Sequence, residues 1–447
     1  MTANGNIIDR LQTLIGKAQS LGAEAADAVY VNSTSLSLSQ RLGNPEDVMR
    51  SEDHDLGLRV LIGKRQAVVS SSDMADSALD ELAERAVAMA RHVPEDQYCG
   101  LADPDQLAGD LVDIDDFDPT EPTAEELIQL AAACEDAARA VSGVTNSEGA
   151  DASWSASEIA LVTSTGFAQT RRASRHSIGV SVLAGEGTGM ERDYDFATKV
   201  YGADLPDAAG IGTSAGEKAV KRLNPQKVST AQVPVIFDPR VANSIVGHLS
   251  SAINGSAVAR GTTFLKDAMG EAVFAPGITI VDDPHRRRGL RSKPFDGEGV
   301  ATRPVNVIED GRLTTWFLDC RSARQLKLTT TGHAARGTSS PPSPSASNLY
   351  MEAGTVSPED LIGAVDKGLY VTELIGMGVN GVTGDYSRGC SGFWIENGEL
   401  AFPVSELTIA GNLKDMFKAV TPASDLEFKY GTNAPTLRLD GMTVAGK

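Results

Sequence analysis

The sequence predicts an α+β fold. An N-terminal domain of helices packed on an antiparallel sheet precedes a β-rich C-terminal domain, sheet- or barrel-like, with a few helices. Three observations predict it. A chain of 447 residues is too long for one ordinary hydrophobic core. Helical and strand patterns are interleaved up to residue 225, whereas hairpins dominate beyond it. Asn224-Pro225 stops a helix, so we place the main boundary between Asn224 and Gln232, with domains 1–225 and 226–447.

The N-terminal domain is expected to contain four amphipathic helices, because apolar residues recur at helical spacing in four segments. The third begins with a capping box, since Thr123 and Glu126 can each satisfy a free amide of the other. The helices are expected at 7–22, 73–93, 123–141 and 207–223. An acidic segment, 95–121, reads as a solvated connection, so this domain could consist of two subdomains, about 1–120 and 121–225.

The strands of the N-terminal domain follow from alternation of apolar and polar residues. Leu36 and Leu38 alternate with serines, and Gly63-Lys64 fits a two-residue hairpin turn with positive φ at the glycine. The expected strands are 28–32, 35–40, 55–62 and 65–71, followed by alternating strands and turns from 144 to 200.

The C-terminal domain is organised around residues 235–265. A strand at 233–237 ends at Asp238-Pro239, and a helix follows whose buried face is marked by Ile245, Leu249 and Ile253. Further along, two strong turn signals, Asp310-Gly311 and Asn397-Gly398, predict two hairpins of one design.

Residues 337–347, rich in proline and serine, cannot join a sheet. They could form a disordered linker or an ordered loop beside a cleft, and composition slightly favours the linker. The remaining elements expected are a short helix at 360–369, an extended glycine-rich segment at 376–392, and two final strands at 436–439 and 442–445 around Asp440-Gly441.

Composition excludes several classes of protein. A net charge of -20 argues against a nucleic-acid-binding surface, which needs a concentrated basic face. No run of 18 apolar residues predicts a membrane span, and the first residues lack the pattern of a signal peptide. The four cysteines have no CxxC pairing, which favours reduced thiols and a cytoplasmic protein.

Two short motifs lack the structural context that would give them a function. Residues 376–381 match GxGxxG, but the glycine-broken sequence after them cannot supply the helix that holds a pyrophosphate. Residues 212–216 match GxSxG, but Ser214 lies inside a predicted helix and not at a strand-to-helix turn. Neither is interpreted as an active site.

The histidines also predict no metal site. No two of the six share a one-turn helical spacing, and His248 stands alone on its helix as a packed or surface residue. Asp282-Asp283 and His285 could offer ligands, but the arginines at 286–288 would repel a divalent cation, so a solvated turn is favoured. Cys390 could be an activated thiol beside Arg388, although no histidine partner is identifiable.

A family resemblance is carried by the segment 368–416, which contains Gly384-Asp-Tyr-Ser-Arg-Gly389. Further markers are Arg260-Gly-Thr262, Thr331-Gly-His333, Pro435-Thr-Leu437 and Thr443-Val-Ala-Gly446. Over essentially its whole length, the sequence resembles the TldE (PmbA) branch of the TldD/PmbA family. In the TldD branch, an HExxxH helix and a more C-terminal cysteine bind zinc, and the glutamate is the general base.

The resemblance implies that this chain lacks the catalytic zinc. Counted back from Arg260-Gly-Thr262, the histidine positions are Val246 and Ser251, and the glutamate position is Gly247. Valine and glycine cannot bind zinc, and a serine hydroxyl is a poor ligand. No cysteine follows Cys390, so the third ligand is missing as well. We therefore expect no catalytic residue, no metal and no cofactor in this chain, and no activity when it is alone.

A TldD-like metallopeptidase subunit, which would carry the zinc, is therefore the implied partner in a heterodimer. Family roles include maturation of peptide antibiotics and degradation of an antitoxin, and an older label is modulator of DNA gyrase. Extended peptide is the expected substrate, held by backbone hydrogen bonds. The candidates for lining the peptide cleft lie in the loops 332–348 and 376–392: Gly332, His333, Asn348, Gly378, Gly381, Asp385, Tyr386 and Arg388.

Two other functions stay open. The chain could be a stand-alone peptide-binding adaptor or gyrase modulator without a protease, or a hydrolase that uses Cys390 with a nearby histidine. The sequence also leaves open whether the isolated chain forms a homodimer.

Overall fold

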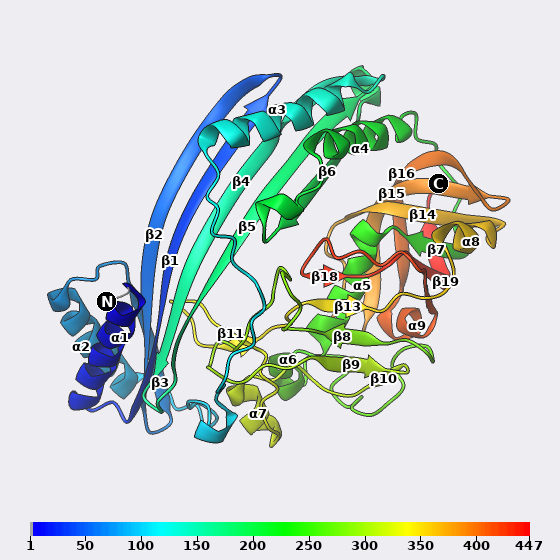
Figure 1. The fold of residues 1–447 in the computed structure, drawn as a ribbon. Helices are drawn as coiled ribbons and strands as arrows, with labels where there is room; N and C mark the ends of the chain where they lie inside the picture. Colours follow the sequence, from blue (N-terminus) through cyan, green and yellow to red (C-terminus); the bar gives the residue numbers. More distant parts are fainter. Residues whose placement is uncertain (1–2) are drawn as a thin grey trace.

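In the computed structural model, which describes residues 3–447, a long curved sheet arches over a β-rich C-terminal domain (Figure 1). We call this sheet the arch, and its strand order is β3-β2-β1-β4-β5-β6. All of its neighbouring pairs are antiparallel, which confirms the predicted α+β class. The strands are β1 (Ala25–Arg41), β2 (Asn44–Ile62), β3 (Arg65–Ser71), β4 (Val144–Thr163), β5 (Ala168–Ala184) and β6 (Glu191–Lys199).

Two pairs of helices pack on the arch, one at each end (Figure 1). Strand β1 contacts both pairs with the same face, because Ala28 belongs to the core of the first pair and Leu38 to that of the second. On the opposite face, Val29 packs with Phe167 and with Phe295 of the C-terminal domain. The first pair is α1 (Ala3–Ser20) and α2 (Asp76–His92), and the second is α3 (Ala124–Ala140) and α4 (Ala208–Lys221).

Several local predictions for this domain are confirmed. Thr123 and Glu126 form the predicted capping box of α3. Gly63 has a φ of 57° in the turn between β2 and β3. The predicted buried face of α2 is buried: Leu79, Leu82, Ala83, Ala86, Val87 and Ala90.

Two predictions for this domain are wrong. The expected strands 28–32 and 35–40 are one strand, β1, which pairs without interruption across Ser33 and Thr34 with both β2 and β4. The segment 95–121 is solvated only in part, since Ile114 is buried and Leu107 pairs with Val300 of the C-terminal domain. Apart from one short 3₁₀ turn (Pro104–Gln106), it has no regular structure.

The C-terminal domain contains a closed, barrel-like sheet. Its strands follow the order β16-β15-β14-β7-β19, and β16 also pairs with β19, so the sheet closes on itself. The strands are β7 (Ala231–Phe237), β14 (Lys367–Ile375), β15 (Asp385–Glu396), β16 (Glu399–Asn412) and β19 (Leu437–Ala445), with β17 (Val420–Pro422) added to β19.

A second, smaller sheet lies beside the barrel, and α5 (Pro239–Ala252) is buried between the two. Asp238 caps α5, and the predicted face of Ile245 and Leu249 is fully buried. The second sheet has the order β10 (Arg312–Leu313), β9 (Val305–Glu309), β8 (Ile280–Asp282), β13 (Leu349–Met351) and β18 (Thr432–Asn433). The short elements are α6 (Gly255–Arg260), α7 (Cys320–Leu326), α8 (Pro358–Gly363), α9 (Leu413–Lys418), β11 (Ala334–Ala335) and β12 (Ser343–Pro344).

Both predicted hairpins are confirmed, with positive φ at Asp310-Gly311 and at Asn397-Gly398. Other expectations are wrong. Asp440-Gly441 lies at an irregularity within the single strand β19, not at a turn between two strands. Residues 385–392 belong to β15, and the helix expected at 360–369 is only α8.

Residues 337–347 are not a linker. The expectation that they cannot join a sheet is also wrong, because β12 pairs with β11. The remainder is an ordered loop that packs on the arch, where the Thr338 hydroxyl donates a hydrogen bond to Asp55. A Cβ atom on Gly57 would lie 2.1 Å from the Thr338 carbonyl oxygen, so only glycine allows this approach of loop and strand. Composition alone could not predict this tertiary contact.

Within residues 3–447, no helix is both long and apolar enough to span a bilayer.

A buried ion-pair network joins the arch to the C-terminal domain. The carboxylate of Asp27 on β1 accepts a hydrogen bond from Arg59 on β2, at 3.0 Å from its Nε, and another from Arg336. All three side chains are almost fully buried. Burial alone would raise the pKa of Asp27, but the two guanidinium groups outweigh it and lower that pKa.

Replacing Asp27 with asparagine should destabilise the protein by about 3–5 kcal/mol, because Arg336 would lose its ion-pair partner and Arg59 would keep only the more distant Glu298, at 4.0 Å. Urea unfolding followed by tryptophan fluorescence measures this change. Glu148→Gln, at an exposed pair with Arg192, is the matched control and should cost less than about 1 kcal/mol. Equal costs for the two variants would contradict the structural importance of the buried network.

Candidate functional site

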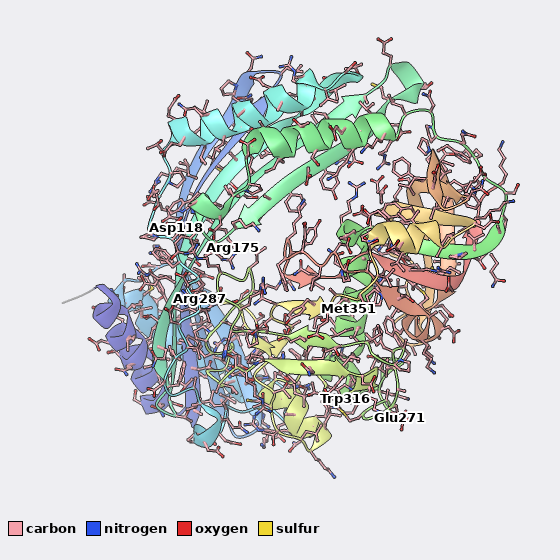
Figure 2. The ribbon with its side chains drawn as sticks, turned by 45° about the vertical axis from the view of Figure 1, so that its right-hand side comes forward. Asp118, Arg175, Glu271, Arg287, Trp316 and Met351 are labelled. Atoms are coloured by element: carbon pink, nitrogen blue, oxygen red, sulfur yellow. The ribbon has the colours of Figure 1, made fainter. Side chains whose placement is uncertain are left out.

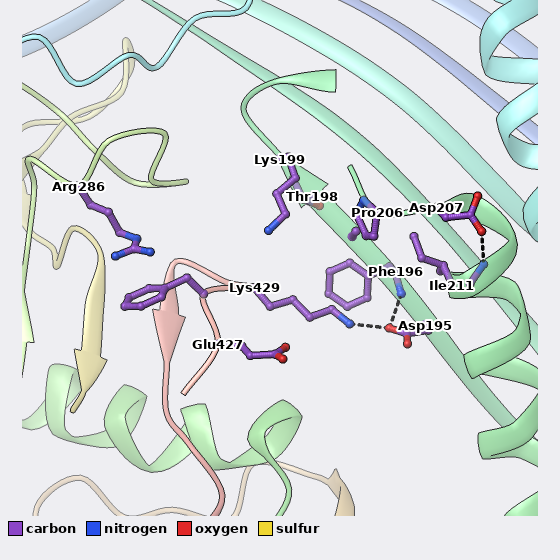
Figure 3. A pocket seen from close by; sticks show the side chains of 13 residues that line it. Asp195, Phe196, Thr198, Lys199, Pro206, Asp207, Ile211, Arg286, Glu427 and Lys429 are labelled. Carbon is purple, nitrogen blue, oxygen red and sulfur yellow. Dashed lines mark hydrogen bonds and ion pairs between the residues drawn. The ribbon is translucent and has the colours of Figure 1, made fainter. Parts of the chain in front are cut away.

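A cavity of about 710 Å³ lies between the arch and the C-terminal domain (Figure 3). One wall is Asp195–Lys199 of β6 with the start of α4, and the other is Arg286 with Glu427–Lys429. An adjacent cavity of about 310 Å³ shares Lys199, Arg286 and Phe428 with the first. We call the two together the interdomain cleft. Its position makes it the main candidate for binding an extended ligand.

The cleft contains two cations that form no ion pair within the described chain. Lys199 and Arg286 have no ion-pair partner among residues 3–447, and Figure 3 shows both side chains directed into the cavity. The Arg286 guanidinium lies 3.2 Å from the ring centroid of Phe428, and burial lowers the pKa of Arg286. Asp195, in contrast, is paired with Lys218 at 2.7 Å and with Lys429. Asp207 and Glu427 line the same cavity, also without an ion-pair partner among the described residues, so the cleft offers groups of both signs although the chain carries a net charge of -20.

Strand β6 presents an edge beside this cleft. It pairs with β5 on one side, and no other strand of residues 3–447 pairs with it. The backbone N–H groups of Tyr194 and Phe196 donate instead to the carboxylates of Asp193 and Asp195, each at 2.8 Å. An extended peptide could replace such contacts with strand pairing.

Ion pairs fix the walls of the cleft where the arch meets the C-terminal domain. Figure 2 shows Asp118 and Arg175 on the arch side of this junction and Arg287 beside it. Arg287 pairs with Asp115 at 3.1 Å, and Arg175 donates to the Leu290 carbonyl oxygen. The predicted solvated turn is confirmed in part: the segment forms turns in which Arg287 and Arg288 are exposed, but their ion pairs tie it to the rest of the chain and Arg286 is partly buried.

The degenerate zinc positions on α5 hold no ligand set. Val246 is fully buried in the apolar core, and Gly247 offers no side chain. The hydroxyl of Ser251 is exposed and donates to the Gly247 carbonyl oxygen at 3.1 Å. No group of three histidine, cysteine or carboxylate side chains in the described chain is arranged to hold a metal ion. These residues do not fit a zinc ion.

His248, on the same helix, is half-buried and packs edge-on against Tyr386, with ring centroids 5.8 Å apart. Burial and the nearby charge of Arg388 lower the pKa of His248 to about 4. The imidazole is therefore neutral at physiological pH, and its Nε2 has no hydrogen-bond partner among the described residues.

The predicted cleft residues of loop 332–348 serve mainly in internal contacts. His333 is buried, with its Nε2 3.1 Å from Asp282 and its ring against Phe317. Asn348 is also nearly buried and donates to the Asp283 carbonyl oxygen, yet it lines part of the interdomain cleft. A Cβ on Gly332 would lie 2.6 Å from the Ala301 carbonyl oxygen. Their contact with a peptide stays a prediction.

The predicted residues of segment 376–392 divide between an exposed loop and β15. Gly378 and Gly381 belong to the loop, and Asp385 at the start of β15 is exposed. Tyr386 is buried beneath α5, whereas Arg388 is partly exposed and lines a third cavity described below. The structure therefore brings Tyr386, Arg388 and His248 together and leaves the loop residues apart from them.

Cys390 is not an activated nucleophile. Its thiol is buried, and burial raises the pKa of Cys390 to about 12, so the thiolate is absent at neutral pH. No hydrogen bond joins it to a histidine within the described part of the chain. These facts remove the basis for a cysteine hydrolase.

Of the residues that line the interdomain cleft, sequence reasoning named Asn348 and missed the others. Lys199, Arg286 and Phe428 come from three distant segments, and none belongs to a recognisable motif. Only the run of arginines at 286–288 was a visible signal, and its charge alone suggested solvent exposure.

Comparison with known proteins defines the class. Models of the PmbA/TldA metallopeptidase family match this chain in three parts: domain 1 at residues 26–90, the central domain at 117–223 and the C-terminal domain at 230–446. The chain therefore belongs to the PmbA/TldD metallopeptidase family. Within it, the similarity is to the PmbA (TldE) branch, as predicted.

Individual relatives cover nearly the whole chain. Metalloprotease PmbA of Escherichia coli O157:H7 is 39% identical over 427 residues, which is 95% of this chain and 93% of that protein. A Bacteroides thetaiotaomicron crystal structure, described as a candidate modulator of DNA gyrase, has a TM-score of 0.91 with 25% identity and covers 100% of both chains. TldE from Thermococcus kodakarensis has a TM-score of 0.86 with 22% identity, covering 98% of this chain and 100% of that one.

The lowered pKa of His248 predicts a pH dependence of stability. Between pH 7 and pH 5 the unfolded chain gains a proton at this residue and the folded chain does not, so the free energy of unfolding should fall by about 2 kcal/mol. Urea unfolding of wild type and His248→Gln at both pH values measures this component, which the variant should lack. His92→Gln, at an exposed histidine, should keep the wild-type dependence. The same pH dependence in His248→Gln would contradict the prediction.

Proposed function

We propose that this chain is the non-catalytic subunit of a zinc metallopeptidase complex that acts on unfolded or small peptides. The observation that carries the proposal is that α5 has the surroundings of a zinc-binding helix without zinc-binding side chains. The helix retains its preceding strand, its cap and its buried face, but Val246, Gly247 and Ser251 stand where a metallopeptidase of the TldD type carries its chemistry. A TldD-like partner would supply the zinc and the general base.

In this complex the chain would contribute walls that hold an extended peptide. The interdomain cleft supplies the space, the edge of β6 supplies backbone groups, and Lys199 and Arg286 supply positive charge. The loops 332–348 and 376–392 are proposed as additional lining. Peptide-antibiotic maturation and antitoxin degradation are the roles that this chemistry would serve.

We also propose a cytoplasmic location. All four cysteines are free and buried, which suits a reducing compartment. This supports the proposal without depending on any motif.

A stand-alone peptide-binding adaptor is the second candidate. One feature of the cleft favours the adaptor: both of its walls come from a single chain, so peptide binding does not require a partner. The description of the Bacteroides protein as a gyrase modulator belongs to that protein and leaves its mechanism unstated.

Metal analysis and a casein-type assay separate the two candidates. The purified chain should hold less than about 0.1 zinc per molecule and should show no turnover, because it lacks a three-residue ligand set. Addition of a TldD-like partner from the same cell should produce activity above that of the partner alone. A partner with glutamine at the HExxxH glutamate is the control for contaminating proteases.

Stoichiometric zinc with turnover in the isolated chain would contradict the proposal. Failure to co-purify with a TldD-like chain, together with direct peptide binding, would favour the adaptor.

The cleft cations give a separate test. In the active complex, Lys199→Gln and Arg286→Gln should each lower kcat/KM for an acidic peptide about tenfold, because each removes an unpaired charge from the cleft. Lys367→Gln, at an exposed lysine without an ion-pair partner among the described residues, is the matched control and should change kcat/KM less than twofold. Equal effects of all three substitutions would show that the cleft charge plays no part.

A further inference from the structure

A smaller cavity of about 270 Å³ lies at the start of α5, apart from the interdomain cleft. Its walls come from α5, from β14 and β15 of the barrel, and from β6 of the arch. Four arginines line it, against only two carboxylates: Arg192, Arg222, Arg240 and Arg388, with Asp193 and Glu373. An excess of guanidinium groups inside a protein requires an explanation, because buried charge is costly without a partner.

The two carboxylates are already occupied. Asp193 pairs with Arg240 at 2.7 Å, and Glu373 pairs with Arg222 and also accepts a hydrogen bond from Ser391 at 2.9 Å. Arg192 is turned outward to Glu148. Arg388 is therefore the one lining arginine that has no ion-pair partner among residues 3–447.

Several donors at this cavity also lack acceptors. The Nε–H groups of Arg388 and Arg240 are buried and unpaired within the described chain, as is the hydroxyl of Thr372. Thr372 is only 7% exposed, and it lies at the irregularity of β14 between Val371 and Glu373, where the pairing with β15 shifts. Such a bulge redirects a side chain, and here it places the hydroxyl in the cavity wall.

Behind this wall, the hydroxyl of Tyr386 and the Nε2 of His248 are likewise buried without partners among the described residues. Both of these atoms can accept as well as donate, so within the described chain the need for an acceptor comes from the unpaired Nε–H groups of Arg388 and Arg240, and the need for negative charge from the unpaired Arg388 guanidinium. The planar fork of an arginine matches a carboxylate, which can accept two parallel hydrogen bonds. The volume admits one such group with a short piece of chain but not a folded partner.

We propose that this cavity is a carboxylate-binding subsite, in which Arg388 is the principal donor and Thr372 and the Nε–H of Arg240 complete the set. The carboxylate is that of a peptide, either its C-terminus or an acidic side chain, and this source rests on the proposed function. Binding itself needs no metallopeptidase partner. The subsite would hold one end of a peptide against the arch.

The experiment titrates the isolated full-length chain by calorimetry with trialanine, with trialanine C-terminal amide and with inorganic phosphate. Trialanine should bind saturably, and the amide at least tenfold more weakly. Binding of the two peptides with equal affinity would overturn the carboxylate assignment, as would saturable binding of phosphate alone. A lack of saturable binding by any probe would show that only solvent fills the cavity, and would overturn the proposal.

Variants test the named residues. Arg388→Gln should weaken trialanine binding at least tenfold. Arg388→Lys, which keeps the charge but loses the fork, should weaken it less, and Thr372→Val, which keeps the shape, should weaken it about threefold. Arg65→Gln, at an exposed pair with Glu95, controls for the change in net charge and should bind as wild type. Melting curves verify folding, and unchanged binding in a folded Arg388→Gln protein would overturn the proposal.

A histidine NMR spectrum provides a second readout. The charge of Arg388 acts on His248, and the His248 ring packs against the ring of Tyr386. The ring signals of His248 should therefore shift on addition of trialanine. Those of the exposed His92 should not. These measurements use the isolated chain, so their outcome is independent of the zinc and peptidase tests of the proposed function.

Discussion

The buried carboxylate of Asp27, held between Arg59 and Arg336, is the constraint on which the functional geometry depends. It joins the arch to a loop of the C-terminal domain, and the interdomain cleft takes one wall from each. The apolar contact of Phe167 with Phe295 and the close approach at Gly57 reinforce the same junction. An ion pair in this position contributes more to a fixed relative orientation than to net stability, because desolvation offsets much of its attraction.

The distribution of charge follows from this arrangement. The chain as a whole is strongly acidic, but Lys199, Arg286 and Arg388 are left without carboxylate partners in the cavities between the domains. Low-dielectric walls strengthen the field of such charges locally, whereas solvent and salt screen the acidic exterior. The interior of the junction therefore contains positive charges, unpaired within the described chain, that the net charge alone does not reveal.

Local rules predicted what local interactions determine: the fold class, the capping box at Thr123, the buried face of α2, and the turns at Gly311 and Gly398. They failed where tertiary partners decide. Ser33 and Thr34 remain in a strand because β2 and β4 pair on both sides, and Thr338 is ordered by Asp55 on another domain. The positions of α5 that correspond to zinc ligands were inferred from the family resemblance, whereas the cleft was not predicted, because Lys199 and Arg286 meet only in the folded chain.

The closure of the barrel also sets an order of events during folding. Strand β19, formed by the last residues of the sheet, pairs with β7, β16 and β17, so the barrel cannot close before residues 437–445 leave the ribosome. The arch uses only earlier strands and can form first. Until the barrel closes, the apolar face of α5 lacks the strands that cover it in the folded protein and stays exposed. Such long-range pairings are slow to form. The nascent C-terminal half is therefore the part of this protein that most needs protection from aggregation.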